Sequence, residues 1–223
     1  ICTRSADLNN TTNKLVSYLS RANVDVKLLV NQDSIFSAYL KALAKINPDP
    51  DDIIILCHDD INITTDPIIF KSLMLEKFAL KNTGFLGVAG TRKLSESAVW
   101  WDLNLWKQQF HSGYALHGDN LADGDPSYYG KYGQVVALDG LFLVAQAKTL
   151  QKIDMKKPTS FSGKWDFYDI WYTIQAHKAG LKNYTIPVVL LHNSRGELAG
   201  RDSWHKNREA FIRKYKASFP IEV

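Results

Sequence analysis

Apolar residues along the first ninety positions follow two alternating periodicities. Short runs rich in Val, Ile and Leu are typical of buried strands, whereas apolar residues every three or four positions are typical of one face of a helix. The predicted strands are 1–2, 24–30, 53–57 and 84–90. The predicted helices are 8–19, 35–46 and 67–80. This order predicts an α/β protein with a single Rossmann-like, mixed and mainly parallel sheet that has helices on both faces.

The second half of the chain has a less regular pattern. Residues 98–132 are rich in aromatic residues and glycine, so we expect irregular loops there. The remaining predicted elements are a strand at 141–145 and a short helix after it, a helix from about 166 to Gly180, a strand ending at His192, a basic flexible segment at 195–201 and a last helix at 204–215.

The most informative stretch is the predicted strand Ile53–Cys57 and the polar residues that follow it, His58, Asp59 and Asp60. The carboxyl ends of strands in open α/β sheets are where ligands bind. Two adjacent carboxylates repel each other unless a cation lies beside them, and a divalent ion shared with a substrate diphosphate would meet that need. The alternative is a solvated acidic turn, and this stretch alone leaves both interpretations open.

Length and composition restrict the class of protein. A chain of 223 residues with 45% hydrophobic residues can form one domain, 1–223. The formal charge is only +4 and the basic residues are dispersed, so no nucleic-acid partner is predicted. No apolar run reaches the ~18 residues that a transmembrane helix needs. Residue 1 already belongs to a predicted strand, so we expect the natural start to lie upstream.

Cysteine usage favours a reducing compartment. Cys2 and Cys57 both lie in strand-like apolar sequence, where they are expected to be buried, reduced thiols. Together with the lack of a membrane span, this predicts a soluble, cytoplasmic protein.

Other positions offer chemistry with two possible interpretations each. The aromatic residues of 98–132 can stack on sugar rings or can simply cover the end of the sheet. Asp166 and Asp169 stand at a predicted helix start, where an acid is either a cap or a functional group. His192 ends a strand, a typical place for a metal-binding imidazole. Neither GxGxxG nor GxxxxGK[ST] occurs, so a bound nucleotide would be held by a metal ion and loop residues.

Several short stretches together, by their order and spacing, give the chain a family resemblance. They are CTRS at 2–5, VNQDS at 30–34, HDDI at 58–61, LDG at 138–140, FYDIW at 167–171, LLHNS at 190–194 and RKY at 213–215. With these stretches the chain resembles GT-A-fold, nucleotide-sugar-dependent glycosyltransferases, most closely the inverting family-2-like enzymes. More narrowly, it is similar to the small capsid-glycosylating transferases of large algal viruses.

The resemblance implies a role for particular residues. The nucleotide would be bound by Thr3, Arg4, Ser5, Asn31 and Asp59. Mn²⁺ or Mg²⁺ would be bound by Asp60 and His192, with His58 standing where the family has the first Asp of its DxD motif. The general base would be Asp169, and the sugar and acceptor would meet Asp139, Gly140, Trp101 and Asp166. Arg195 or Arg201 would neutralise the diphosphate.

The function implied by the resemblance is metal-dependent transfer of a sugar from a nucleoside-diphosphate sugar, expected to be a UDP-sugar, to a hydroxyl of a glycan or glycoprotein, with inversion. Residues 1–97 would form the nucleotide-binding half and residues 98–223 the acceptor-binding and catalytic half. Two other classes stay open: a sugar nucleotidyltransferase, and a carbohydrate-binding module without catalysis.

Overall fold

The computed structural model describes residues 1–194 and 202–223. The helices are α1 Asn10–Arg21, α2 Ile35–Ile46, α3 Pro67–Phe78, α4 Leu103–Lys107, α5 Ala147–Lys152, α6 Tyr168–Lys178 and α7 Asp202–Tyr215, with a 3₁₀ turn at Lys216–Ser218. The strands are β1 Ile53–Cys57, β2 Ile61–Ile63, β3 Thr83–Gly87, β4 Ala89–Thr91, β5 Lys93–Leu94, β6 His111–His117, β7 Asp125–Gly130, β8 Gln134–Val135, β9 Ala137–Leu138, β10 Phe142–Gln146, β11 Lys182–Thr185, β12 Leu190–His192 and β13 Ile221–Glu222.

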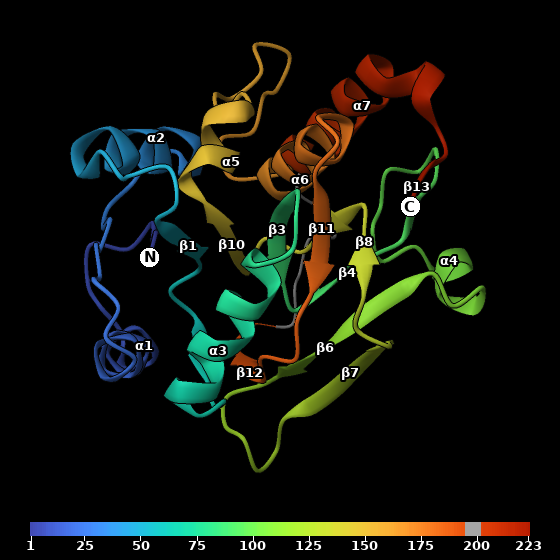
Figure 1. Ribbon diagram of the computed structural model, residues 1–223. Helices are drawn as coiled ribbons and strands as arrows, with labels where there is room; N and C mark the ends of the chain where they lie inside the picture. The colour runs from blue at the N-terminus through green and yellow to red at the C-terminus, as the bar shows by residue number, and fades with distance from the viewer. Residues whose placement is uncertain (195–201) are drawn as a thin grey trace.

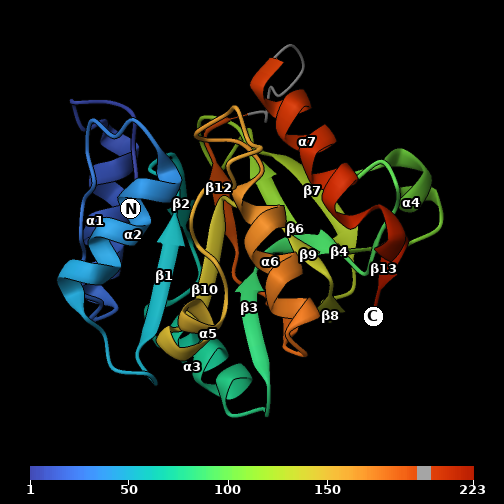
Figure 2. The same cartoon turned by 90° about the horizontal axis from the view of Figure 1, so that it is seen from above.

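The strands form two larger sheets and one small one, and helices lie on both sides of the first. The first sheet has the order β1-β10-β3-β11-β8, the second has the order β2-β12-β6-β4-β9 with β7 on β6, and β13 pairs with β5. Helices α2, α5, α6 and α7 lie on one side of the first sheet, and α1 and α3 lie on the other (Figure 1). Seen from above, β1, β10 and β3 run side by side (Figure 2). The predicted α/β class with a mixed sheet is confirmed.

Antiparallel pairing predominates over the parallel pairing expected from the sequence. Among the described strands, only β11 with β3 and β12 with β6 pair in parallel. In the first sheet, β10 lies antiparallel between β1 and β3 instead of continuing a series of parallel strands. In the second sheet, β6 pairs antiparallel with both β4 and β7.

The strand predicted at 24–30 is reduced to a single bridge. Cys2 makes parallel bridges to Leu29 on one side and to His58 on the other. The backbone hydrogen bonds here run from Leu29 to Ile1 and from Thr3 to Leu29, over 2.9 and 3.0 Å. A strand needs a hydrogen-bonded neighbour along its length, and within the described residues the extended neighbour that bonds this segment is limited to Ile1 and Thr3. The expectation of a full strand was therefore wrong. The segment nevertheless lies next to the first residues of the chain, through the bridge between Cys2 and Leu29.

Residues 98–132 are more regular than the sequence predicted. They contain α4 and the antiparallel hairpin β6–β7, in which Tyr114 stands opposite Tyr128. Gly113 adopts φ +106°, and a Cβ there would overlap the backbone of Val88. Glycine thus marks a bulge within the hairpin rather than a break between loops.

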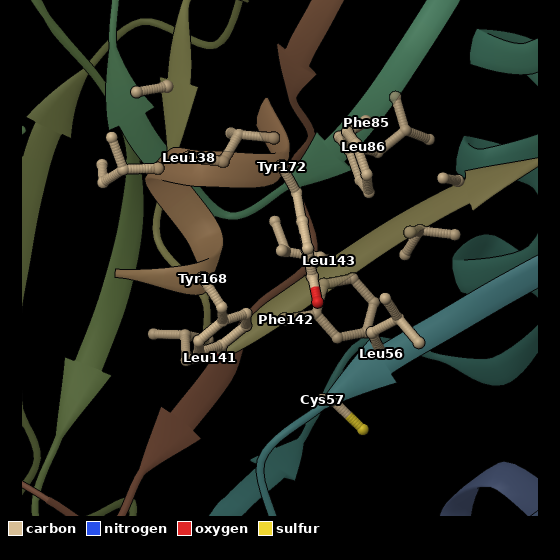
Figure 3. Packing of buried hydrophobic residues seen from close by; sticks show 14 of the residues in the cluster. Leu56, Cys57, Phe85, Leu86, Leu138, Leu141, Phe142, Leu143, Tyr168 and Tyr172 are labelled. Carbon is tan, nitrogen blue, oxygen red and sulfur yellow. The ribbon is translucent and has the colours of Figure 1, made fainter. Parts of the chain in front are cut away.

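Helix α6 is tied to the sheet by a buried asparagine. Asn183 of β11 accepts a hydrogen bond from the Phe85 amide over 2.9 Å and donates to the carbonyls of Thr173 and Val136 over 2.8 and 3.0 Å. Helix α6 packs against β9, β11 and β3, and its Tyr168 and Tyr172 lie among the large side chains of the core (Figure 3). The first turn of α6 therefore has a fixed position relative to the end of β1.

Helix α7 covers the start of α6. The Phe167 and Phe211 rings lie 5.5 Å apart, as do the Phe167 and Trp204 rings. Buried Asn207 donates to the carbonyls of Gly163 and Asp166. No helix in the part of the chain that the structure describes is long and apolar enough to cross a bilayer.

Candidate active site

A cavity of about 470 Å³ opens where β1 ends, and most of the predicted site residues line it. These are Thr3, Arg4, Ser5, Asp59, Asp60, Trp101, Asp139, Gly140, Asp166, Asp169 and His192. A larger cavity of about 870 Å³ lies between residues 24–29 and 53–57, is lined mainly by aliphatic side chains and contains none of the predicted site residues. The smaller cavity is the candidate site because it combines carboxylates, imidazoles and aromatic rings.

Three side chains that line this cavity converge on one point. His58, Asp60 and His192 each offer a ligand atom, and these atoms lie within 4.8 Å of one another. Asp60 Oδ2 is 3.3 Å from His192 Nε2, and Asp60 Oδ1 is 3.7 Å from His58 Nδ1. Asp60 Oδ1 is buried without a hydrogen-bond partner among the described residues. Such an orphaned acceptor beside two imidazoles fits a divalent cation.

The ionisation of two members of this cluster, Asp60 and His58, also suits a cation. Burial raises the pKa of Asp60, but the hydrogen bond and charge of His192 outweigh it and lower that pKa below its ordinary value. Burial lowers the pKa of His58, which keeps its imidazole neutral. A ligand set needs an ionised carboxylate and neutral imidazoles, and Asp60 and His58 already tend toward those forms. Burial lowers the pKa of His192, but the hydrogen bond and charge of Asp60 outweigh it and raise that pKa, so cation binding would displace a proton from this imidazole.

Tyr168 connects His58 to the Asp139–Gly140 turn. The Tyr168 hydroxyl donates to the Gly140 carbonyl over 2.6 Å and lies 2.8 Å from His58 Nε2. Burial raises the pKa of Tyr168 well above its ordinary value, so the hydroxyl keeps its proton. A Cβ at Gly140 would overlap the Tyr168 hydroxyl and would lie 3.0 Å from Asp169 Cβ. Only glycine fits at this position.

Asp169 lies in the first turn of α6 and faces the same cavity. Its Oδ2 accepts from the Gly140 amide over 3.1 Å, and its Oδ1 accepts from the Ile170 amide over 2.8 Å. Burial, and then the charge of Asp139, raise the pKa of Asp169 to about 7. A carboxylate with a pKa near neutrality is suited to accept and release a proton.

The comparisons with known proteins agree with this geometry. A family model described as "Glycosyltransferase like family" matches residues 12–215. The chain belongs to this family. The structure of A197 from STIV is similar to this chain with a TM-score of 0.51 and 11% sequence identity, covering 86% of this chain and 83% of that one. At that identity the similarity concerns the fold alone. No curated protein matches the chain.

The glycosyltransferase places its predicted nucleotide residues around one loop. The Thr3 hydroxyl accepts a hydrogen bond from the Ser5 backbone amide over 3.0 Å. Thr3 is buried, so this bond fixes the conformation of the loop from its inner side. The Arg4 guanidinium lies 4.5 Å from the centre of the Trp165 ring. Asn31 has the left-handed conformation with φ +52°, and its backbone N–H donates a hydrogen bond to the Ser5 carbonyl. Asn31 is exposed and lies beside the loop, outside the cavity lining.

The remaining predicted residues lie in different surroundings. Asp59 lines the cavity, and its carbonyl accepts from the Thr12 hydroxyl over 3.1 Å. Asp139 Oδ1 accepts from the Leu141 amide over 2.9 Å, which holds the turn that carries Gly140. Arg195 and Arg201, predicted to meet the diphosphate, lie outside the described residues.

Asp166 is not the helix cap that one interpretation of the sequence made it. The residue before α6 is Phe167, which has φ +70° and makes no capping bond. Asp166 is buried and accepts from the Ser203 hydroxyl of α7 over 2.7 Å. Its carboxylate thus joins α7 to the start of α6 at the cavity wall.

Sequence reasoning missed four side chains at this site. His58 stands in a motif position that the family fills with Asp, and Tyr168 adjoins the predicted base, yet neither was given a role. Trp165 and Trp204 also line the cavity, and Trp204 lies 5.7 Å from Trp101, ring centre to ring centre. The HDDI and FYDIW stretches drew attention to His58 and Tyr168, but only the fold shows that they touch.

Proposed function

We propose that this glycosyltransferase moves a sugar from a nucleoside-diphosphate sugar to an acceptor hydroxyl with inversion, and that it needs a divalent ion. The observation that carries the proposal is the common cavity of two groups: a His-Asp-His cluster suited to a cation and a carboxylate whose pKa is near neutrality. Leaving-group stabilisation and deprotonation of the acceptor are the two requirements of such a displacement.

The proposed reaction is a single displacement. The acceptor oxygen forms a bond to the anomeric carbon while the bond from that carbon to the diphosphate oxygen breaks. Asp169 takes the hydroxyl proton, and the nucleoside diphosphate leaves with its bonding electrons. A cation held by Asp60 and His192 would supply positive charge to the diphosphate, and Arg195 or Arg201 would add to it.

Further parts of the proposal rest on the family and on the loop residues. We place the nucleotide, expected to be UDP, against Thr3, Arg4, Ser5, Asn31 and Asp59, within the half formed by residues 1–97. The sugar and acceptor would meet Asp139, Gly140, Trp101 and Asp166 in the half formed by residues 98–223. A glycan or glycoprotein, including a capsid glycoprotein, is the proposed acceptor. A cytoplasmic location is supported by Cys2 and Cys57, which are both free and buried.

Incubation with a panel of nucleotide sugars and Mn²⁺ tests this function. We expect release of a nucleoside diphosphate from one donor, with greater release when an acceptor glycan is present. Pyrophosphate release would identify a sugar nucleotidyltransferase instead. Glycan binding without turnover of any donor would identify a non-catalytic module.

The pH dependence of transfer is expected to report Asp169. Because its pKa is raised, the carboxylate gains a proton as pH falls through about 7, whereas an ordinary Asp does so near ~4. The base is then lost, so kcat/KM at saturating Mn²⁺ should fall about tenfold per pH unit on the acid side. Asp139→Asn removes a charge that raises this pKa and should move the acid limb to lower pH. An unmoved limb in that variant would contradict the assignment.

Trp101 and Trp100 give a matched pair of variants that tests whether an aromatic side chain of the cavity binds sugar. Trp101 lines the cavity, whereas Trp100 is only 3% exposed and belongs to the core. Trp101→Ala should raise the acceptor KM more than the donor Kd, and should lower the melting temperature less than Trp100→Ala does, because Trp101 is only partly buried against Trp100 and Trp204. Trp100→Ala should lower the free energy of unfolding by ~3–5 kcal/mol and the melting temperature by roughly 6–20 °C. Melting curves beside kinetics with varied acceptor check both, and equal donor and acceptor effects for Trp101→Ala would reject a sugar platform.

A further inference from the structure

The hydrogen bonds of Tyr168 determine which nitrogen of His58 carries a proton. A carbonyl oxygen only accepts, so the single Tyr168 hydroxyl proton lies toward Gly140, 2.6 Å away. The hydroxyl oxygen must then accept from its other neighbour, His58 Nε2, at 2.8 Å. Nε2 is therefore the protonated nitrogen.

Nδ1 of His58 is left with a lone pair that faces the cluster. A neutral imidazole carries one ring proton, and Nε2 holds it. Nδ1 is 3.7 Å from Asp60 Oδ1, too far for a hydrogen bond, and this oxygen is buried without a partner among the described residues. Two lone pairs that face each other repel, and a cation between them would satisfy both.

We propose that His58 is a third metal ligand through Nδ1, that Tyr168 positions it by holding the Nε2–H tautomer, and that the resulting site selects a transition-metal ion such as Mn²⁺ over Mg²⁺. The inference rests on the proposed metal-dependent function and deepens it. Two imidazole nitrogens and one carboxylate, from His58, His192 and Asp60, make a ligand set that favours first-row transition metals. Mg²⁺ prefers oxygen ligands and retains its water, so a site with two nitrogens suits it poorly.

Tyr168 acts through His58 and is a positioning residue. Partners of ligating histidines fix the tautomer and ring orientation, and their loss typically costs ~10–100-fold in metal affinity. Here the partner also bonds Gly140, whose amide donates to Asp169. The chain of contacts His58–Tyr168–Gly140–Asp169 thus joins the metal cluster to the proposed base.

Metal binding by calorimetry, without any sugar transfer, tests the positioning role. Mn²⁺ should bind the natural chain at least ~10-fold more tightly than Mg²⁺, and Tyr168→Phe should weaken Mn²⁺ binding by ~10–100-fold. Tyr172→Phe is the matched control, since Tyr172 is buried on the same helix and donates to the Met155 carbonyl, away from His58. It should leave Mn²⁺ affinity unchanged. Equal effects of the two variants, in proteins with the same melting temperature, would overturn the role of Tyr168.

The ligand atom and the tautomer are read by spectroscopy. With ¹⁵N-histidine, pulsed EPR of the Mn²⁺-loaded chain should show two coupled imidazole nitrogens, and His58→Ala should leave one. NMR of the metal-free chain should show the Nε2–H tautomer for His58 and its loss in Tyr168→Phe. A single coupled nitrogen in the natural chain, or a doubly protonated His58 at neutral pH, would overturn the inference. His58→Asp should shift selectivity toward Mg²⁺, and an unchanged Mn²⁺ to Mg²⁺ ratio would likewise count against it.

These results are separable from the function itself. Two coupled nitrogens with no nucleoside diphosphate release from any donor would reject the proposed transfer and keep the ligand assignment. Transfer supported equally by Mg²⁺ and Mn²⁺, with one coupled nitrogen, would reject the ligand assignment and keep the transfer.

Discussion

Asp169→Asn should bind donor and Mn²⁺ nearly as the natural chain does, yet its rate of sugar transfer should fall about 10²–10⁴-fold. The amide keeps the size of the carboxylate, and its oxygen can still accept from the Gly140 or Ile170 amide. It cannot take a proton at neutral pH, so the acceptor hydroxyl keeps its own. Single-turnover kinetics beside donor calorimetry separate the chemical step from binding.

Asp66→Asn is a suitable control for that variant. Asp66 caps α3, where its Oδ1 accepts from the Ile68 and Ile69 amides, and Asn caps a helix about as well as Asp. The control should keep full activity. Asp166→Asn serves less well, because Asp166 is buried against Ser203 and does not cap α6.

A transfer rate near the natural one in Asp169→Asn would reject the base assignment. The anomeric configuration of the product, read by NMR, then decides what replaces it. Inversion would point to Asp139, the neighbouring carboxylate on the cavity wall, whereas retention would point to a mechanism without an enzymic base.

Local sequence patterns were sufficient for the elements that carry the site. The helix predicted at 35–46 from its apolar spacing is present as α2, and the Ser34 hydroxyl caps it by accepting from the Ser37 amide. The apolar run Ile53–Cys57 forms β1 and brings His58, Asp59 and Asp60 to the lining of the cavity. Helical spacing and short apolar runs depend on near neighbours in the chain, which is why the sequence alone predicted these two elements.

Features that depend on distant partners were not predictable in this way. The hairpin β6–β7 exists because β6 pairs with β7 and also with β4 and β12, although neither strand of the hairpin shows a clean apolar alternation. The role of His58 as a third candidate ligand depends on its contact with the Tyr168 hydroxyl, and Tyr168 lies 110 positions further along the chain. Asp166 looked like a cap because α7, which supplies Ser203, cannot be placed from sequence.

Asp60→Ala should abolish Mn²⁺-dependent nucleotide binding and leave the fold intact. Asp60 supplies the one carboxylate of the cluster, and without it His58 and His192 present two neutral or partly charged imidazoles with no anion between them. Loss of a ligand should exceed the ~10–100-fold cost of losing a ligand's partner, so Mn²⁺ affinity should fall by at least ~100-fold. The Asp60 carbonyl would still accept from the Asn193 amide, which preserves the local backbone.

Calorimetry with UDP, in the presence and absence of Mn²⁺, measures this effect. Asp51→Ala is the control, because it also removes a carboxylate near β1, but one that is exposed and paired with Lys148. The control should bind UDP in the same Mn²⁺-dependent way as the natural chain. If Asp60→Ala also kept its Mn²⁺-dependent affinity, the cation would be held elsewhere, and His58, Asp60 and His192 would be only a polar cluster where β1 and β12 end.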